Sequence, residues 1–113
     1  MKFVRSSTEY DLDQHGVYLS GRPEGESAFE SLLEEAQNLG NGELIISFRG
    51  VEGLSHSFCD SAVAELFKEL EDGSLTSNNL TVEFAHISNP GVESTLISVL
   101  DDIGIENPPI LAS

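Results

Sequence analysis

The sequence predicts a single α/β domain in which three amphipathic helices flank a four-stranded sheet, mostly parallel or mixed. Three helix-start signals, each followed by apolar residues at helical spacing, alternate with two strongly apolar segments. The expected order is β-β-α-β-α-β-α, and such alternation is typical of parallel strands joined by right-handed crossovers. A chain of 113 residues is near the usual size of one domain, so residues 1–113 are assigned to a single domain.

Three helix starts can be read from capping residues. Ser27 and Glu30 match a capping box, in which a hydroxyl and a carboxylate accept hydrogen bonds from free backbone N–H groups. Ser57, with Asp60 three residues later, gives the second start by the same rule. The third is Asn89-Pro90, a capping side chain followed by proline at the first helical position.

The strand signals differ in strength. Residues 43–48 (ELIISF) are a continuous apolar run, which is typical of a strand covered on both faces, and residues 80–87 (LTVEFAHI) alternate. Residues 2–6 (KFVRS) and 16–21 (GVYLSG) are predicted as two further strands. Residues 103–113 are expected to form an extended tail. Six residues from these strands and helices are predicted to lie in the core: Leu44, Ile46, Phe48, Leu66, Val82 and Leu96.

The charge of the chain limits the classes of partner. Asp and Glu outnumber Lys and Arg by 20 to 5, which gives a formal net charge of −15. Such a surface repels phosphate backbones and anionic lipids, so neither nucleic acid nor a membrane is an expected partner. The acidity fits solubility or a salt-rich cell interior. It also fits a protein that attracts a basic protein partner through its negative electrostatic field, or one that mimics nucleic acid.

Cysteine and histidine usage gives no sign of a cofactor or a metal. Cys59 is the single cysteine, so an internal disulfide and a thiolate metal site are excluded, and His15, His56 and His86 show no ligand spacing. Neither a phosphate-binding loop nor a dinucleotide fingerprint occurs. The first residues lack the apolar run of a signal peptide and no stretch is long enough to span a bilayer, so we expect a cytoplasmic protein.

Residues 50–60 (GVEGLSHSFCD) carry two hydroxyls, an imidazole, a thiol and two carboxylates around one predicted helix start. The cluster of Ser57, His56 and Asp60 could serve a small hydrolase, with Ser57 as nucleophile and His56 as base. Adjacent residues at a helix start point in different directions, however, and no oxyanion loop is evident, so we expect a protein without catalytic activity. Cys59 is expected to be a buried core residue rather than an activated thiol, and His56 a surface residue.

Residues 43–66 (ELIISFRGVEGLSHSFCDSAVAEL), with the order of elements, resemble a STAS domain, the fold of anti-sigma factor antagonists. More closely, the chain is similar to the small bacterial STAS-like proteins of unknown function. In these an apolar strand, a Gly-Val pair and a Ser-Phe-x-Asp segment follow one another, here as IISF, Gly50-Val51 and residues 57–60. Arg22, ahead of the first helix, resembles the arginine that precedes that helix in the family. The resemblance spans about residues 17–100.

The resemblance implies a regulatory, protein-binding module. In the antagonists, the loop after this strand reads Asp-Ser-Ser-Gly, and its second serine is phosphorylated by the partner anti-sigma kinase. Alignment through Val51 places Ser57 on that phosphoacceptor. The family's loop aspartate, first serine, glycine and strand-end aspartate are replaced here by Ser55, His56, Phe58 and Ser47.

The implied partner is an anti-sigma or histidine-kinase-like ATP-binding protein. The implied contact residues lie in the strand-to-helix loop 50–60: Gly53, Ser55, His56, Ser57, Phe58 and Asp60.

Overall fold

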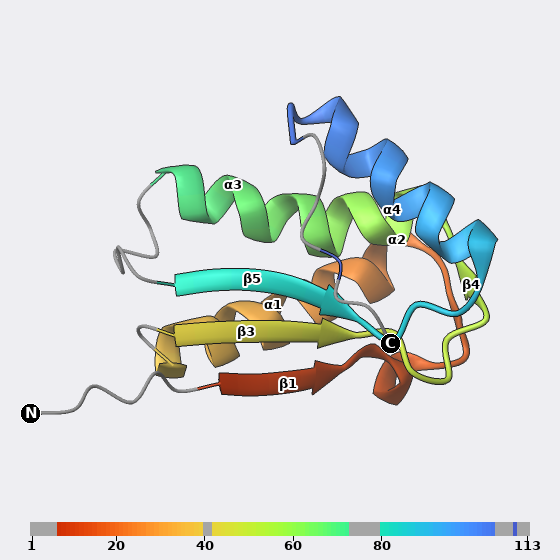
Figure 1. The fold of residues 1–113 in the computed structure, drawn as a ribbon. Coiled ribbons are helices and arrows are strands. Elements are labelled where there is room, and N and C mark those ends of the chain that lie inside the picture. Colours follow the sequence, from red (N-terminus) through yellow and green to blue (C-terminus); the bar gives the residue numbers. More distant parts are fainter. Residues whose placement is uncertain (1–6, 40–41, 73–79, 106–109, 111–113) are drawn as a thin grey trace, which may run out of the picture.

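The computed structural model describes residues 7–39, 42–72, 80–105 and 110 (Figure 1). Its strands are β1 (Ser7–Asp11), β2 (Tyr18–Leu19), β3 (Gly42–Ser47), β4 (Gly53–Leu54) and β5 (Leu80–Ala85). Its helices are α1 (Arg22–Leu39), α2 (His56–Cys59), α3 (Glu65–Asp72) and α4 (Pro90–Asp102), with a 3₁₀ turn η1 (Leu12–His15) and a π-helical segment η2 (Asp60–Ala64). The mixed α/β class is therefore confirmed.

The strands of the described residues form two parallel sheets rather than the expected four-stranded one. The larger sheet has the order β1-β3-β5, and the smaller consists of β2 and β4. The predicted strand at residues 2–6 lies outside the described residues. β1 instead lies between the two segments, 2–6 and 16–21, that were predicted as strands. Its residues look polar because β1 is an edge strand in which Tyr10 alone is fully buried.

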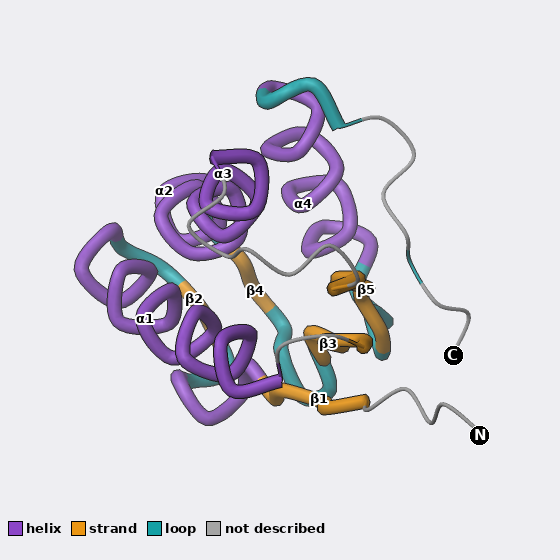
Figure 2. The backbone as a smooth tube through the Cα atoms, turned by 90° about the vertical axis from the view of Figure 1, so that its left-hand side faces the viewer, coloured by secondary structure: helices purple, strands orange, loops and turns teal. Residues whose placement is uncertain are grey.

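The larger sheet has helices on one face, as Figure 2 shows with the strands seen nearly end-on. On β3, Leu44 and Ile46 are buried, whereas Ile45 is partly exposed. The register places Ile45 between Glu9 of β1 and Glu83 of β5. The prediction that residues 43–48 are covered on both faces is therefore wrong, because these glutamates give the second face a polar surface. β3 is nevertheless the central strand.

Helix α1 begins earlier than its sequence signal. Ser27 and Glu30 are exposed residues inside α1, so the predicted capping box is wrong. The helix starts at Arg22, directly after Gly21, whose φ of 88° turns the chain, and Pro23 occupies the first turn. Proline is tolerated there because the first N–H groups of a helix have no intrahelical acceptor.

The start of α4 is as predicted. The Asn89 side-chain oxygen accepts hydrogen bonds from the backbone N–H groups of Gly91 (2.8 Å) and Val92 (3.3 Å). Pro90 is the first helical residue. Two of the free N–H groups are thus satisfied by one side chain.

The core lies between the helices and the inner face of the larger sheet. All six predicted core residues are at most 5% exposed, which confirms that prediction. Of the predicted tail, Ile103 is the C-cap residue that follows α4, and Ile110 forms a parallel β-bridge with Phe84 of β5. Residues 106–109 and 111–113 of the tail lie outside the described residues. Among the described helices, none has the length and apolar content needed to cross a membrane.

Candidate functional site

Residues 48–55 carry the chain from the larger sheet to the smaller one. The Phe48 N–H donates to the Ala85 carbonyl (2.9 Å), and the Val51 N–H donates to the Phe48 carbonyl (3.0 Å) in a tight turn. Gly50 has a φ of 82°, a left-handed conformation that favours glycine. The chain then pairs with β2 as β4 and enters α2, so the predicted contact loop 50–60 contains a short strand of its own.

Ser55, rather than Ser57, caps α2. The Ser55 hydroxyl oxygen accepts from the Phe58 N–H (3.1 Å), and the Ser55 carbonyl accepts from the Cys59 N–H (3.1 Å). Ser57 lies one residue inside the helix, so its predicted role as the cap is wrong. The capping-box rule selected Ser57 because Asp60 follows it at the right spacing. Ser55 instead has the extended backbone, with φ −83° and ψ 157°, that a cap requires.

The three side chains considered for hydrolysis contact three different groups. The Ser57 hydroxyl oxygen lies 3.3 Å from that of Ser55. His56 Nε2 lies 3.9 Å from an Asp102 carboxylate oxygen at the end of α4, and the His56 side chain is exposed, as predicted. An Asp60 carboxylate oxygen is 3.1 Å from Arg22 Nη2. The geometry therefore does not pair Ser57 with a base.

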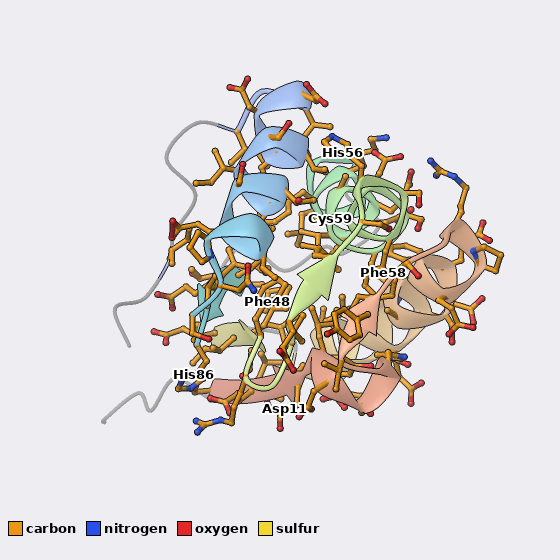
Figure 3. The ribbon with its side chains drawn as sticks, turned by 90° about the vertical axis from the view of Figure 1, so that its right-hand side faces the viewer. Asp11, Phe48, His56, Phe58, Cys59 and His86 are labelled. Carbon is orange, nitrogen blue, oxygen red and sulfur yellow. The ribbon has the colours of Figure 1, made fainter. Side chains whose placement is uncertain are left out.

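Phe58 and Cys59 point into the core (Figure 3). Phe58 is completely buried, so its assignment to a partner-binding surface is wrong. Cys59 is also completely buried, as predicted. Burial raises the pKa of the Cys59 thiol to about 12, and the negative charge of Asp60 adds to the rise. The thiol therefore stays protonated near neutral pH and is a poor nucleophile.

Helix α1 packs tightly against α2 and η2 beside this site. A Cβ at Gly25 would overlap the Ser61 hydroxyl and lie 2.7 Å from the Phe58 carbonyl oxygen. The Ser61 hydroxyl lies 2.7 Å from the Ser57 carbonyl oxygen and 3.3 Å from that of Arg22. This close contact fixes the first turn of α2 against the first turn of α1.

The small sheet places an exposed aromatic ring next to the start of α2. Tyr18 is 71% exposed and Val17 is 42% exposed, while Leu19 is buried. A Cβ at Gly53, the partner of Tyr18 in the register, would lie 2.8 Å from Cδ1 of the Tyr18 ring. The ring therefore rests on the Gly53 backbone. Our sequence reasoning missed Tyr18, although its alternation with Leu19 in a strand was a usable signal.

A second polar cluster joins β1 to the segments that directly follow β3 and β5. Arg49 Nη2 is 3.0 Å from His86 Nε2, and a Glu9 carboxylate oxygen is 3.5 Å from the same nitrogen. Because a guanidinium group can only donate, a hydrogen bond between Arg49 and His86 uses His86 Nε2 as the acceptor. His86 has a φ of 60°, which is uncommon outside glycine. In Figure 3, His86 lies well away from His56.

The Glu9, Arg49 and His86 cluster was also missed, because its members are far apart in the sequence. The third histidine, His15, contacts the Tyr10 hydroxyl (2.7 Å). In the described part of the chain, no group of three His, Cys, Asp or Glu side chains is arranged to hold a metal ion.

Comparison with known proteins identifies a family. A family model described as a STAS-like domain of unknown function (DUF4325) matches residues 24–91, more than half of the chain. Neither a curated protein nor a solved structure matches the chain in the same comparisons. The matched segment includes most of α1, the central strand β3, loop 50–60 and the cap of α4. This chain therefore belongs to the family of STAS-like domains of unknown function.

Proposed function

We propose that this protein is a non-catalytic regulatory module that acts in the cytoplasm and binds another protein through the start of α2 and the adjoining β2–β4 pair. The observation that carries the proposal is the exposed Tyr18 ring, held on the Gly53 backbone directly before the cap of α2. Tyrosine supplies a large, rigid contact area at low entropic cost and is enriched at interface hot spots.

The rigidity of this surface supports the proposal. The Ser55 N–H donates to the Leu19 carbonyl (2.8 Å), which joins the cap of α2 to β2, and Arg22 pairs with Asp60 across the two helix starts. A surface that is ordered before binding loses less conformational entropy when a partner docks. The contact residues that we retain from the sequence are Gly53, Ser55, His56, Ser57 and Asp60, and we add Tyr18 because its ring is exposed beside them.

Ser57 is the proposed phosphorylation site, as the resemblance to anti-sigma factor antagonists implies. Its side chain is partly exposed in the first turn of α2, and its hydroxyl contacts that of Ser55. A phosphate there would place about −1.5 to −2 charges within a close-packed contact. Those charges would have to leave water when a partner docks, so phosphorylation would weaken binding. The proposed partner is an anti-sigma or histidine-kinase-like ATP-binding protein.

A pull-down from the native cell tests the proposal, with tagged wild type, Ser57→Asp and Glu26→Gln as baits. Aspartate in the first turn suits the helix dipole, so Ser57→Asp should fold. Glu26 is exposed on α1 and serves as the control. We expect wild type and Glu26→Gln to recover an ATP-binding protein, and Ser57→Asp to recover less of it. Wild-type bait isolated from the cell should carry phosphate on Ser57. Equal recovery of the same proteins by all three baits would contradict the proposal.

A further inference from the structure

The exposed residues around Tyr18 form a surface that is both aromatic and acidic. We define the Tyr18 patch by four exposed residues: Asp13, Val17, Tyr18 and Glu52. The Glu52 N–H donates to the Val17 carbonyl (2.8 Å). An Asp13 carboxylate oxygen would lie 3.0 Å from a Cβ at Gly50, two residues before Glu52. The two segments that carry the patch therefore run side by side.

A pocket continues this surface toward α4. The Asn89 side-chain NH₂ donates to the Glu52 carbonyl (3.1 Å), so the cap of α4 is tied to the patch. Asn89 also lines a pocket of about 130 Å³, which we call the Glu93 pocket and which is lined by Ile87, Ser88, Asn89, Pro90 and Glu93. Glu93 is exposed and supplies the negative charge of the pocket.

Among the described residues, the carboxylates of this surface have no basic partner. In the described residues, Arg22 pairs with Asp60, and Lys68 pairs with Glu65. Asp13, Glu52 and Glu93 form no ion pair with any described side chain. A net charge of −15 adds a long-range attraction for a basic partner. The exposed ring and the unpaired carboxylates are thus complementary to a guanidinium group, which stacks on aromatic faces and binds carboxylates.

We propose that the Tyr18 patch and the Glu93 pocket together bind a basic segment of the partner protein. One arginine of that segment stacks on the Tyr18 ring beside Glu52, and a second basic side chain enters the Glu93 pocket. The inference rests on the proposed function, since it specifies the chemistry of the partner at that site. It does not involve Ser57, so a charge added at Ser57 should not weaken this contact.

Peptide probes test the inference on the full chain by NMR titration. The probes are three eight-residue peptides in which glycine alternates with arginine, with lysine or with serine. We expect the arginine peptide to shift the amide signals of Tyr18, Glu52, Gly53 and Glu93, and to bind more tightly than the lysine peptide. The serine peptide should give no shift. Ser57→Asp should bind the arginine peptide at least as well as wild type, which separates this result from the pull-down.

Variants then locate the contact. Tyr18→Ala should weaken binding of the arginine peptide about two- to five-fold and abolish its advantage over the lysine peptide, whereas Tyr18→Phe should retain both. Glu93→Gln should weaken binding more than Glu26→Gln, which removes the same charge elsewhere. The inference is overturned if Tyr18→Ala binds like wild type, or if Glu26→Gln and Glu93→Gln weaken binding equally. Either result would mean that net charge alone attracts the peptide.

Discussion

The hydroxyl oxygen of Ser55 accepts a hydrogen bond from the backbone N–H of Phe58 at 3.1 Å, and this contact defines the start of α2. Ser57, two residues later, makes its side-chain contact with Ser55 rather than with a free N–H group. We therefore expect Ser55→Ala to lower the free energy of unfolding by about 0.5–2 kcal/mol, the usual loss for a removed cap. Ser57→Ala should lower it by less than about 0.5 kcal/mol.

Urea denaturation of both variants measures the difference. A larger loss for Ser57→Ala than for Ser55→Ala would show that the cap lies at Ser57, as the sequence alone had suggested.

The contrast between α2 and α4 shows what local sequence can determine. At α4, Asn89-Pro90 combines a strong cap with a residue that fits the first helical position, and no competing signal lies nearby. At α2, Ser55 and Ser57 are both of a residue type that can cap a helix. The spacing from Ser57 to Asp60 matched a capping box and therefore favoured the wrong serine. The choice depends on the pairing of β4 with β2, which sets the backbone conformation of Ser55.

The proposed contact residue that the sequence did not predict, Tyr18, depends on a distant pairing in the same way. Tyr18 stands out only once β2 is paired with β4, because Gly53 supports its ring. β4, with only two residues, carries too little periodicity to be read from the sequence. The core was predictable, because long apolar stripes on the helices and on β3 and β5 leave few alternative arrangements.

Gly25 of α1 lies in close contact with Ser61 of η2, so we expect Gly25→Ala to destabilise the protein. At an exposed position inside a helix, alanine is more favourable than glycine by about 1 kcal/mol. Here the added methyl group would overlap the Ser61 hydroxyl and crowd the Phe58 carbonyl oxygen. Overpacking of this kind typically costs about 1–3 kcal/mol, so the net effect should be a loss. Thermal denaturation monitored by circular dichroism measures it.

A double variant provides the control for this contact. Ser61→Ala removes the nearest overlapping atom, so Gly25→Ala should be less harmful in that background than in wild type. A stabilising Gly25→Ala would mean that α1 does not pack this closely on η2.

Leu66 of α3 is completely buried in the core. Its truncation therefore tests the predicted apolar stripe of that helix. We expect Leu66→Ala to lower the free energy of unfolding by about 2–5 kcal/mol, through lost transfer energy and the cavity that remains. Lys68→Ala, on the exposed side of α3, should change it by less than about 0.5 kcal/mol. A loss below about 1 kcal/mol for Leu66→Ala, measured by urea denaturation, would place this residue outside the core.

The buried thiol of Cys59 should make the protein less stable at alkaline pH. Its pKa is about 12 in the folded chain, against an ordinary value of 9.0. Between these two values the unfolded chain releases the thiol proton and the folded chain keeps it. The stability due to this group is therefore fully present below pH 9 and is lost as the pH rises toward about 12. The free energy of unfolding should fall by up to about 1.4 kcal/mol per pH unit in this range.

The contribution of Cys59 can be separated from that of the other groups that titrate there. Burial also raises the pKa of Tyr10, so the wild-type protein alone cannot assign the slope. Cys59→Ala lacks the thiol and retains Tyr10, so its free energy of unfolding should fall less steeply above pH 9. Urea denaturation of both proteins at pH 8 and pH 10.5 gives the two slopes. Equal slopes would mean that the Cys59 thiol ionises in the folded chain as readily as in the unfolded one, and hence that it is open to solvent.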